Sequence, residues 1–572
     1  MNDVGARGRR REILAATALA ATAVVFAVLV FGRLGHPLFW YDEAETAAYA
    51  QRVLHFGYPK IHDGKNTLYS LRPSFRRAGI GLDEATDAYT GSPWLQYYVG
   101  ALGVAAGTGE GDLYARSAWV RLPFALAGCA GLVLLFAAVR PALGPGRARL
   151  FAFAALNALL LSGSVQLVLH LREARHYSLT VLGAAAFVFC FLHRHVLRSL
   201  TYCRYAFGLC GSLLWLFHAF YPAALAFGAS SGLWLLGAAL RRAGSLRVRA
   251  AWFAREAAPL LAAALLTAPL LGFFDFYAQT QNWVGPYLDA SRWLGTVGFV
   301  SSILFRQEWL APALALRVAV EWLARLPESL GDTAFARRLA SARFLWLAIL
   351  VYALEMTGIP LRFERYFIVL GPLLCAALLL DLASAWDLAR APAVSSRRTA
   401  RAGIALAATA AAAVLALRAP EIAGRVAEIR TPYRGPLDYA IPYLMERYAD
   451  PSALVIATNY EEPAFMFYLG SHVLVGFYAP DLAQDLEQIP DVIIARPWPD
   501  HMDALRELST RAHYEPHALP VANLRWNNTP SLAPRAGFPV GHHFRDPVVG
   551  VDGPELVILE RVPEPDAAPA AR

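Results

Sequence analysis

The sequence predicts a polytopic α-helical membrane protein with a soluble α/β domain at its C-terminal end. Three observations support this fold class. First, 57% of the 572 residues are hydrophobic and only 17% are charged, whereas soluble domains carry about 25% charged residues. Second, several apolar runs approach the ~20 residues that a helix needs to cross a bilayer. Third, the apolar runs after residue 437 are short, β-branched and bounded by Pro, Asp and Gly, as strands are.

The positive charge indicates which linkers face the cytoplasm. The net charge is +8, and the arginines gather in short stretches between apolar runs, as retained linkers do. They form no basic surface interleaved with aromatic residues, so we expect no nucleic acid partner. The first apolar run, Ile13 to Phe31, follows RGRRRE and exceeds the ~7–15 residues of a signal-peptide core. We therefore expect a first membrane helix with its N-terminus inside.

Alternation of basic and less basic linkers predicts about eleven membrane spans. A transmembrane domain then covers residues 1–420 and includes a long outer segment over 35–118. In that segment SPWLQYYVGALGVAAG is short and Gly-rich, which favours a helix on the membrane surface. The predicted spans are Ile13–Phe31, about Trp119–Val139, about Leu150–Leu169, Ser178–Leu192, two that flank HAFYP, Ala257–Phe274, Trp309–Leu323, Phe344–Leu354, Phe367–Leu380 and Ile404–Leu417.

Residues 421–572 follow the last span and are predicted to form an α/β domain on the outer side. The runs ALVIAT, DVIIARP and ELVILERV have strand composition, and EEPAFMFYLG and DLAQDLEQ between the first two are predicted to be helical. All five cysteines lie in or beside apolar runs, so the sequence implies no disulfide framework.

Two arginine pairs lie at the outer ends of spans, where retained positive charge is not expected. Arg172 and Arg175 occur in LREARHYSL, and Arg362 and Arg365 occur in LRFERYF. Single arginines at span ends often extend to the lipid headgroups. Two such pairs, each followed by a tyrosine, favour a functional role, because guanidinium groups match the geometry of phosphate.

An acidic pair follows the first span in FWYDEAETAAYA. Asp42 precedes a helical pattern and Glu45 stands three residues later, so one interpretation is an N-cap with a capping box. Asp42 and Glu43 behind three aromatic residues also fit a partly desolvated base. The two interpretations are compatible.

Both lysines of the chain, Lys60 and Lys65, lie in GYPKIHDGKN in the outer segment. They are candidates for binding a donor phosphate, although a genome that favours arginine codons would also leave few lysines. His62 and Asp63 beside them are metal-ligating types, but two adjacent ligands are a weak signal. The sequence predicts no cofactor and leaves open whether a divalent cation takes part.

Four motifs together resemble a known family. YDEA after the first span, VRLPFALAG at residues 120–128, REARHYSL after the third span and ERYFIVLGP at 364–372 are similar to the GT-C membrane glycosyltransferases. Within them the likeness is to the dolichyl-phosphate-mannose–protein mannosyltransferases and the bacterial lipid A aminoarabinose transferases. The resemblance implies a polyprenyl-phosphate sugar donor and a lipid, glycan or protein acceptor. It also implies a multi-pass protein of the bacterial inner membrane, surrounded by membrane lipids, with a periplasmic C-terminal domain.

The resemblance also implies roles for particular residues. Asp42 would take the proton of the acceptor hydroxyl in an inverting displacement. The acceptor or sugar pocket would be lined by Glu43, Glu173 and Tyr177, and the donor phosphate would be bound by Arg172, Arg175, Arg365, Tyr366, Lys60 and Lys65. Relatives often have Lys-Pro-Pro where this chain has Ser92-Pro93-Trp94, and some have Asp in place of Glu173.

The residues are also consistent with this chemistry without the family. A glycosidase needs a second carboxyl group because its leaving alkoxide must be protonated, whereas a sugar phosphate leaves as a stable anion. One base and several cations then suffice. The alternatives are a transporter or lipid or glycan flippase, whose inverted repeats we do not find in the sequence, and an assembly factor, which would leave the outer charges without a role.

Overall fold

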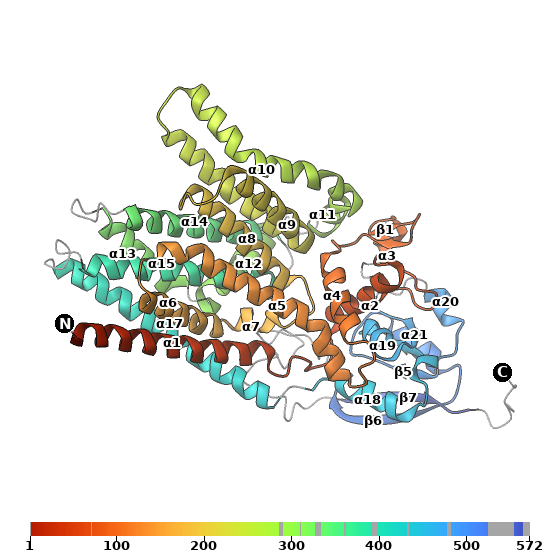
Figure 1. Ribbon diagram of the computed structural model, residues 1–572. Helices are drawn as coiled ribbons and strands as arrows, with labels where there is room; N and C mark the ends of the chain where they lie inside the picture. Colours follow the sequence, from red (N-terminus) through yellow and green to blue (C-terminus); the bar gives the residue numbers. More distant parts are fainter. Residues whose placement is uncertain are drawn as a thin grey trace. The chain divides into compact units, whose positions relative to one another are not determined.

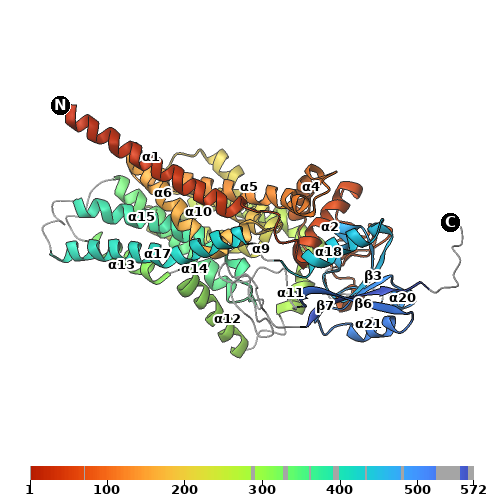
Figure 2. The ribbon, with the colours of Figure 1, turned by 90° about the horizontal axis from the view of Figure 1, so that it is seen from below.

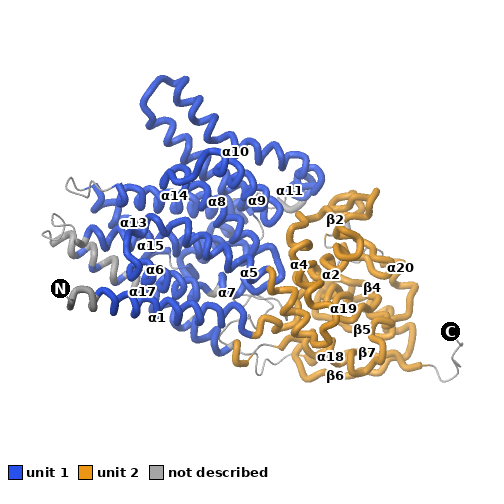
Figure 3. Tube along the Cα trace, in the orientation of Figure 1, with its two compact units in different colours: residues 1–32, 124–427 blue, residues 33–123, 428–572 orange. Residues whose placement is uncertain are grey.

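The computed structural model is mainly helical and has a small sheet domain near its C-terminus (Figure 1). It describes residues 2–69, 71, 73–284, 290–308, 310–325, 333–359, 362–390, 398–431, 434–477, 482–523 and 554–563. The described chain divides into two compact units, shown in Figure 3. Unit 1 comprises residues 1–32 and 124–427, and unit 2 comprises residues 33–123 and 428–572.

Unit 1 is a bundle of helices, and α5 continues from unit 2 into it. α1 packs against α6, α8 against α9, and α14 against both α9 and α15. Its elements are α1 (Asn2–Phe31), α5 (Leu113–Val139), η1 (Arg140–Ala142), α6 (Arg147–Ser162), α7 (Val165–Leu171), α8 (Tyr177–His195), α9 (Tyr202–Arg241), α10 (Leu246–Phe273), α11 (Phe276–Val284), α12 (Ala290–Ser302), η3 (Ile303–Gln307), α13 (Leu310–Leu323), α14 (Thr333–Met356), η4 (Glu364–Phe367), α15 (Leu370–Arg390) and α17 (Arg398–Arg430).

Seven helices in the described part of the chain are long and apolar enough to cross a membrane. They cover Gly8–Phe31, Leu113–Ala142, Tyr177–His195, Tyr202–Arg241, Leu246–Phe273, Thr333–Met356 and Glu364–Leu388. This confirms a multi-pass helical membrane protein, while the count of about eleven spans stays a prediction. The predicted start of the span at Trp309 and parts of the linkers near 326–332 and 391–397 lie outside the described residues.

The helix α9 reverses direction at Phe220. This residue has a non-helical backbone (φ −154°, ψ 95°) and is followed two residues later by Pro222. Before the break, Gly208 lies against Cys190 of α8. After it, the Phe227 ring lies 5.3 Å from the Phe187 ring of α8. Both arms therefore run beside the same stretch of α8, as two spans flanking HAFYP would.

The predicted span Leu150–Leu169 is interrupted, contrary to expectation. α6 ends at Ser162 and α7 begins at Val165. A Cβ on Gly163 would lie 2.4 Å from the Arg418 side chain, so the break admits a buried arginine. Arg418 pairs with Glu308 at 3.2 Å, and Glu308 accepts a hydrogen bond from Ser164 at 3.0 Å. The break thus lies beside a buried network of hydrogen bonds and one ion pair.

Unit 2 combines the outer segment with the C-terminal sheet domain, whereas the outer segment is predicted from the sequence to belong with the spans. α2 packs against both α4 and α19. Its elements are α2 (Tyr41–Phe56), α3 (Pro73–Arg77), β1 (Leu82–Asp83), β2 (Ala88–Tyr89), α4 (Leu95–Ala106), α18 (Leu437–Arg447), η5 (Pro451–Ala453), β3 (Val455–Thr458), α19 (Glu462–Leu469), β4 (His472–Val475), α20 (Leu482–Leu486), β5 (Val492–Ile494), α21 (Met502–Ser509), β6 (Tyr514–Ala522) and β7 (Glu555–Arg561).

The five-stranded sheet has the order β4-β3-β5-β7-β6. β4, β3 and β5 are parallel, and β7 pairs antiparallel with both β5 and β6. Ala457, Leu474 and Ile493 pack against Leu505 and Leu508 of α21, and α18 lies on the opposite side of the sheet (Figure 2). The predicted α/β domain is confirmed. β4 and β6 are additions to the three predicted strands.

Candidate functional site

The predicted base, Asp42, lies in the first turn of α2. The helix begins at Tyr41, and Trp40 precedes it in an extended conformation with no side-chain cap. The capping-box interpretation of Asp42 and Glu45 is therefore wrong, since Glu45 instead accepts a hydrogen bond from the Tyr97 hydroxyl at 3.1 Å. Asp42 is half-buried, and the positive end of the helix dipole favours its negative charge.

The neighbouring acid, Glu43, has a different environment. Its side chain is fully buried, and the Arg121 guanidinium donates to both carboxylate oxygens, at 2.7 and 2.5 Å. The same guanidinium donates to the carbonyls of Leu34 and Pro37 at 3.0 and 2.8 Å. Glu43 was predicted to line the acceptor or sugar pocket. Its contacts connect the start of α2 to α5, and its role in the pocket stays a prediction.

Aromatic rings surround the start of α2. Tyr41 stacks on Tyr460 with 5.5 Å between ring centroids, and Tyr460 stacks on Trp498 at 4.9 Å. Phe477 packs edge-on against Tyr460 and Trp498. Burial, followed by the charges of Glu461 and Asp42, raises the pKa of Tyr460 well above its ordinary value. The influence of Asp42 shows that its carboxylate lies near this aromatic cluster.

Two further acids lie at the start of α19. Glu461 is buried and pairs with Arg496 at 3.2 Å. Glu462 is 6% exposed and accepts a hydrogen bond from the Tyr41 hydroxyl at 3.0 Å. Burial raises the pKa of Glu462 to about 7, against the smaller lowering effects of nearby backbone N–H groups and Tyr41. Near neutral pH this carboxyl is therefore both a hydrogen-bond donor and an acceptor.

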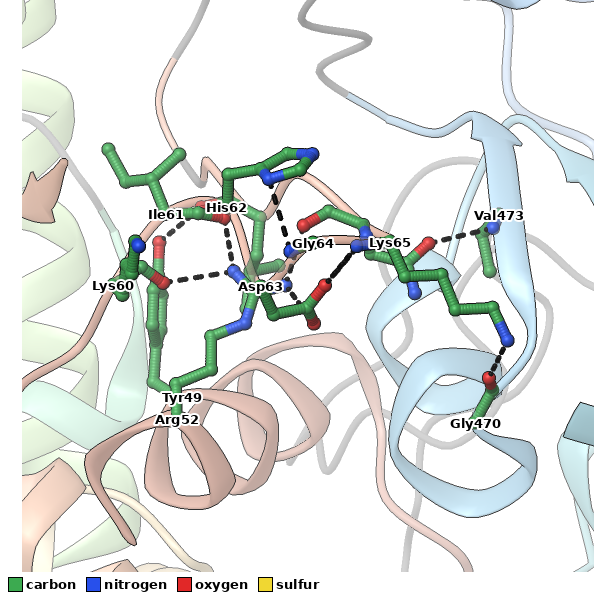
Figure 4. Close-up of polar contacts among 12 residues, drawn as sticks. Tyr49, Arg52, Lys60, Ile61, His62, Asp63, Gly64, Lys65, Gly470 and Val473 are labelled. Carbon is green, nitrogen blue, oxygen red and sulfur yellow. Dashed lines mark hydrogen bonds and ion pairs between the residues drawn. The ribbon is translucent and has the colours of Figure 1, made fainter. Parts of the chain in front are cut away.

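The lysine-containing loop is held by Arg52 of α2 (Figure 4). Arg52 donates to the Lys60 carbonyl at 3.0 Å and pairs with Asp63 at 2.9 Å. The charge of Arg52 and backbone N–H donors lower the pKa of Asp63, although its burial acts in the opposite direction. Lys60 lies over the Phe56 ring, and Lys65 donates to the carbonyls of Ser452 and Gly470 at 2.5 and 2.6 Å.

The described residues contain no group of three His, Cys, Asp or Glu side chains placed to hold a metal ion. His62, one of the two metal-ligating types noted in the sequence, accepts a hydrogen bond from the Gly64 N–H at 3.1 Å. The role of a divalent cation stays open.

In unit 1, residues from three separate segments meet at His176. Burial, together with the charges of Arg175 and Arg365, lowers the pKa of His176 well below its ordinary value. The His176 ring stacks on Phe220 at the reversal of α9, and Phe220 stacks on Tyr366, at 5.4 and 5.2 Å. The structure thus brings together REARHY, HAFYP and ERYF, which are far apart in the sequence.

Other predicted residues of unit 1 have mainly structural contacts. Arg172 is 7% exposed and donates to the carbonyls of Leu29 and Gly32 at the end of α1, at 3.4 and 2.9 Å. Glu173 is 3% exposed, and its Oε1 atom lies 2.6 Å from Nδ1 of His170. Tyr177 is buried, with its ring 5.6 Å from that of His170. These side chains support the segment that carries Arg175.

Asp42, Glu43, Lys60 and Lys65 belong to unit 2, and the predicted arginines belong to unit 1. Sequence reasoning missed Arg121, His170, Tyr460 and Glu462. Arg121 lies inside an apolar helix, where an arginine needs a partner, and that signal could have identified it. The others gave no local signal, because their partners are distant in sequence.

Fold and site together define a multi-pass helical membrane protein. Its unit 2 carries an acid at the start of a helix beside aromatic rings, and its unit 1 carries two arginines around a half-buried histidine. No protein-family model and no curated protein matches the chain.

Three solved structures of an archaeal oligosaccharyltransferase from Archaeoglobus fulgidus are similar to the chain at low levels. AglB in complex with an inhibitory peptide and a dolichol-phosphate has a TM-score of 0.47 and 12% identity, over 84% of this chain and 69% of that chain. The enzyme tethered to an acceptor peptide containing the NVT sequon has a TM-score of 0.37 and 12% identity, over 82% and 64%. Its complex with Zn and sulfate has a TM-score of 0.39 and 11% identity, over 84% and 68%. These likenesses are too distant to assign a function.

The Glu43–Arg121 pair should be essential for the stability of unit 2. We expect Arg121→Met to lower the free energy of unfolding by about 3–5 kcal/mol, because it leaves a buried carboxylate without its partner. The double variant Glu43→Gln/Arg121→Met should recover part of that loss. Denaturant titration in detergent measures the free energy of unfolding of the single and the double variant. Arg506→Met, at an exposed arginine, is the control. A single variant as stable as the wild type would contradict the assignment.

Glu462 should make stability depend on pH. Its folded-state pKa, about 7, lies above the ordinary value of 4.5, so its stabilising contribution is complete below about pH 4.5 and is lost as the pH rises through 7. Relative to Glu462→Gln, the wild type should lose roughly 3 kcal/mol over this window. Unfolding midpoints across the pH range measure the difference, and the exposed Glu446→Gln is the control. If the unfolding midpoints of the wild type and of Glu462→Gln changed in parallel with pH, Glu462 would not contribute this pH dependence.

Proposed function

We propose that the protein is an inverting glycosyltransferase that moves a sugar from a polyprenyl-phosphate donor to a hydroxyl group of a lipid, glycan or protein acceptor. The observation that carries this proposal is the meeting of Arg175 and Arg365 around the half-buried His176. Two guanidinium groups held at the end of a helix bundle suit the phosphate of a lipid-linked donor.

The donor phosphate is assigned first to Arg175 and Arg365, with Tyr366 beside them. The pKa of His176 is lowered by burial and by these two arginines, so the cations are the charged members of the cluster. Arg172 already donates to two backbone carbonyls of the α1 region and is assigned to positioning. Lys60 and Lys65 stay secondary candidates for phosphate binding.

Asp42 is proposed as the base. It is half-buried, so its carboxylate retains access to a substrate, whereas Glu43 is fully occupied by Arg121. The buried aromatic rings of Tyr41, Tyr460 and Trp498 lie beside it. Because a phosphate leaves as a stable anion, one general base suffices. Glu43, Glu173 and Tyr177 are buried and are proposed to position the reacting groups.

We place the reaction on the extracytoplasmic face. The basic linkers RPALGPGRAR and RRAGSLRVR favour a cytoplasmic location, which leaves the opposite ends of their spans on the outer side. REARHY, ERYF and the segment after the first span then face outward together with the C-terminal domain. In a bacterium this face is the periplasmic side of the inner membrane.

Asp42→Asn should abolish turnover. We expect transfer from a labelled polyprenyl-phosphate sugar to fall by about 10²–10⁴-fold, the usual contribution of a general base, while donor binding changes little. Purified enzyme in nanodiscs, tested with a panel of donors and a membrane extract as acceptor source, measures both. Asp503→Asn, whose side chain is 97% exposed, is the matched control. Turnover of Asp42→Asn at the wild-type rate would rule out this base.

Arg175→Ala and Arg365→Ala should each weaken donor binding by about tenfold or more, since each removes a charged hydrogen-bond donor to phosphate. The rate should fall by about 10²–10³-fold, by analogy with a lost oxyanion donor. Equilibrium binding of a fluorescent polyprenyl phosphate measures the affinity, and Arg506→Ala is the control. Unaltered affinity in both variants would remove the phosphate assignment. Donor movement across proteoliposomes without sugar transfer would favour the flippase alternative.

A further inference from the structure

A polar pocket of about 430 Å³ lies inside unit 2, within the ~300–1,000 Å³ range of ligand sites. The outer segment contributes one wall, with Lys65 and Arg76, and the C-terminal domain contributes the other, with Glu462, His472 and Asp485. Figure 4 shows Lys65 extending from the outer segment to Gly470 of the C-terminal domain.

The segment that forms the first wall is fixed by several hydrogen bonds. Asn66 donates to the Ser471 carbonyl and accepts from the Val473 N–H, both at 2.9 Å. Lys65 binds the carbonyls of Ser452 and Gly470. These bonds join the outer segment to the edge strand β4, so the pocket is a built feature of the unit.

Two charged side chains in the pocket lining each have a buried polar atom with no hydrogen-bond partner among the described residues. One is Oε2 of Glu462, whose side chain is 94% buried and whose Oε1 is bound by Tyr41. The other is Nη1 of Arg76. Both residues contribute to the pocket lining, so an acidic and a basic side chain stand on its two walls.

The charges on the two walls restrict the chemistry of that ligand. A simple anion would meet Glu462 and Asp485, and a simple cation would meet Lys65 and Arg76. A hydroxyl group carries no charge and both donates and accepts hydrogen bonds. It can accept from Arg76 and donate to Glu462, and the ring of Tyr69, also in the lining, adds an apolar face.

We propose that this pocket binds an uncharged, hydroxyl-rich saccharide, which serves as the acceptor. The acceptor role, though not the binding, rests on the proposed function. Tyr41 connects the pocket to the predicted base, because its hydroxyl binds Glu462 and Asp42 is the next residue. A saccharide held between Arg76 and Glu462 would thus lie beside the start of α2, where Asp42 can receive a hydroxyl proton.

The test is direct binding in the absence of donor. The full chain in nanodiscs is applied to a glycan array of neutral, sulfated, sialylated and amino-sugar oligosaccharides, and the strongest neutral member is titrated by calorimetry. We expect neutral saccharides to bind best. Arg76→Met should weaken that binding by about tenfold or more, whereas Arg77→Met, on the same short helix but exposed, should not. Gln488→Ala removes an amide that lines the opposite wall, and it should also weaken saccharide binding. This variant replaces Arg76→Met as the test if Arg76→Met fails to fold.

Binding of no array member, stronger binding of charged members, or equal affinity of Arg76→Met and Arg77→Met would each overturn the pocket proposal. The result is independent of catalysis. If Asp42→Asn abolishes transfer while no saccharide binds, the pocket fails and the transferase stands. If saccharides bind the wild type but no donor is consumed, the transferase fails and the pocket stands as a saccharide site.

Discussion

The buried ion pair between Glu43 and Arg121 is the interaction on which the geometry of unit 2 depends. Arg121 projects from α5, a helix that continues into the bundle, and binds the first turn of α2 and two carbonyls before it. Both carboxylate oxygens and all three guanidinium nitrogens take part in hydrogen bonds, and a buried charge is tolerated where such partners are present. It therefore determines where α2 starts and, with that, where Asp42 lies.

Adjacent acids on one helix turn thus have different roles. Glu43 points into the protein and is saturated by Arg121, while Asp42 stays half-buried beside Tyr460 and Trp498. The surroundings, more than the residue type, separate a structural carboxylate from one that can exchange a proton. Glu462 adds a third environment, a buried carboxyl with a pKa of about 7. The start of α2 is consequently a place where proton-accepting and hydrogen-bonding groups of different strength lie together.

Hydropathy predicted the helical class, the reversal near HAFYP and three of the five strands, because each depends on long or clearly bounded apolar runs. β4 has only four residues, and β6 contains Pro516 and Pro520, so neither gave a clear strand pattern. Hydropathy did not predict the helix break at Gly163, because the break depends on Arg418 from a helix distant in the sequence. The arginines at His176 were predicted from their unexpected side of the membrane. The partners of Glu43 and Glu462 were not, because they are contacts between segments far apart in the chain.

Arg175 and Arg365 are proposed to bind the donor phosphate, and Asp42 is proposed to act as the base in the transfer of the sugar. The most direct measurement is a cryo-EM structure of the full chain with a non-hydrolysable polyprenyl-phosphonate sugar. We expect phosphonate density within hydrogen-bonding distance of both guanidinium groups, with the anomeric carbon on the side of Asp42. Phosphonate bound away from the two arginines, or Asp42 remote from the sugar, would contradict it.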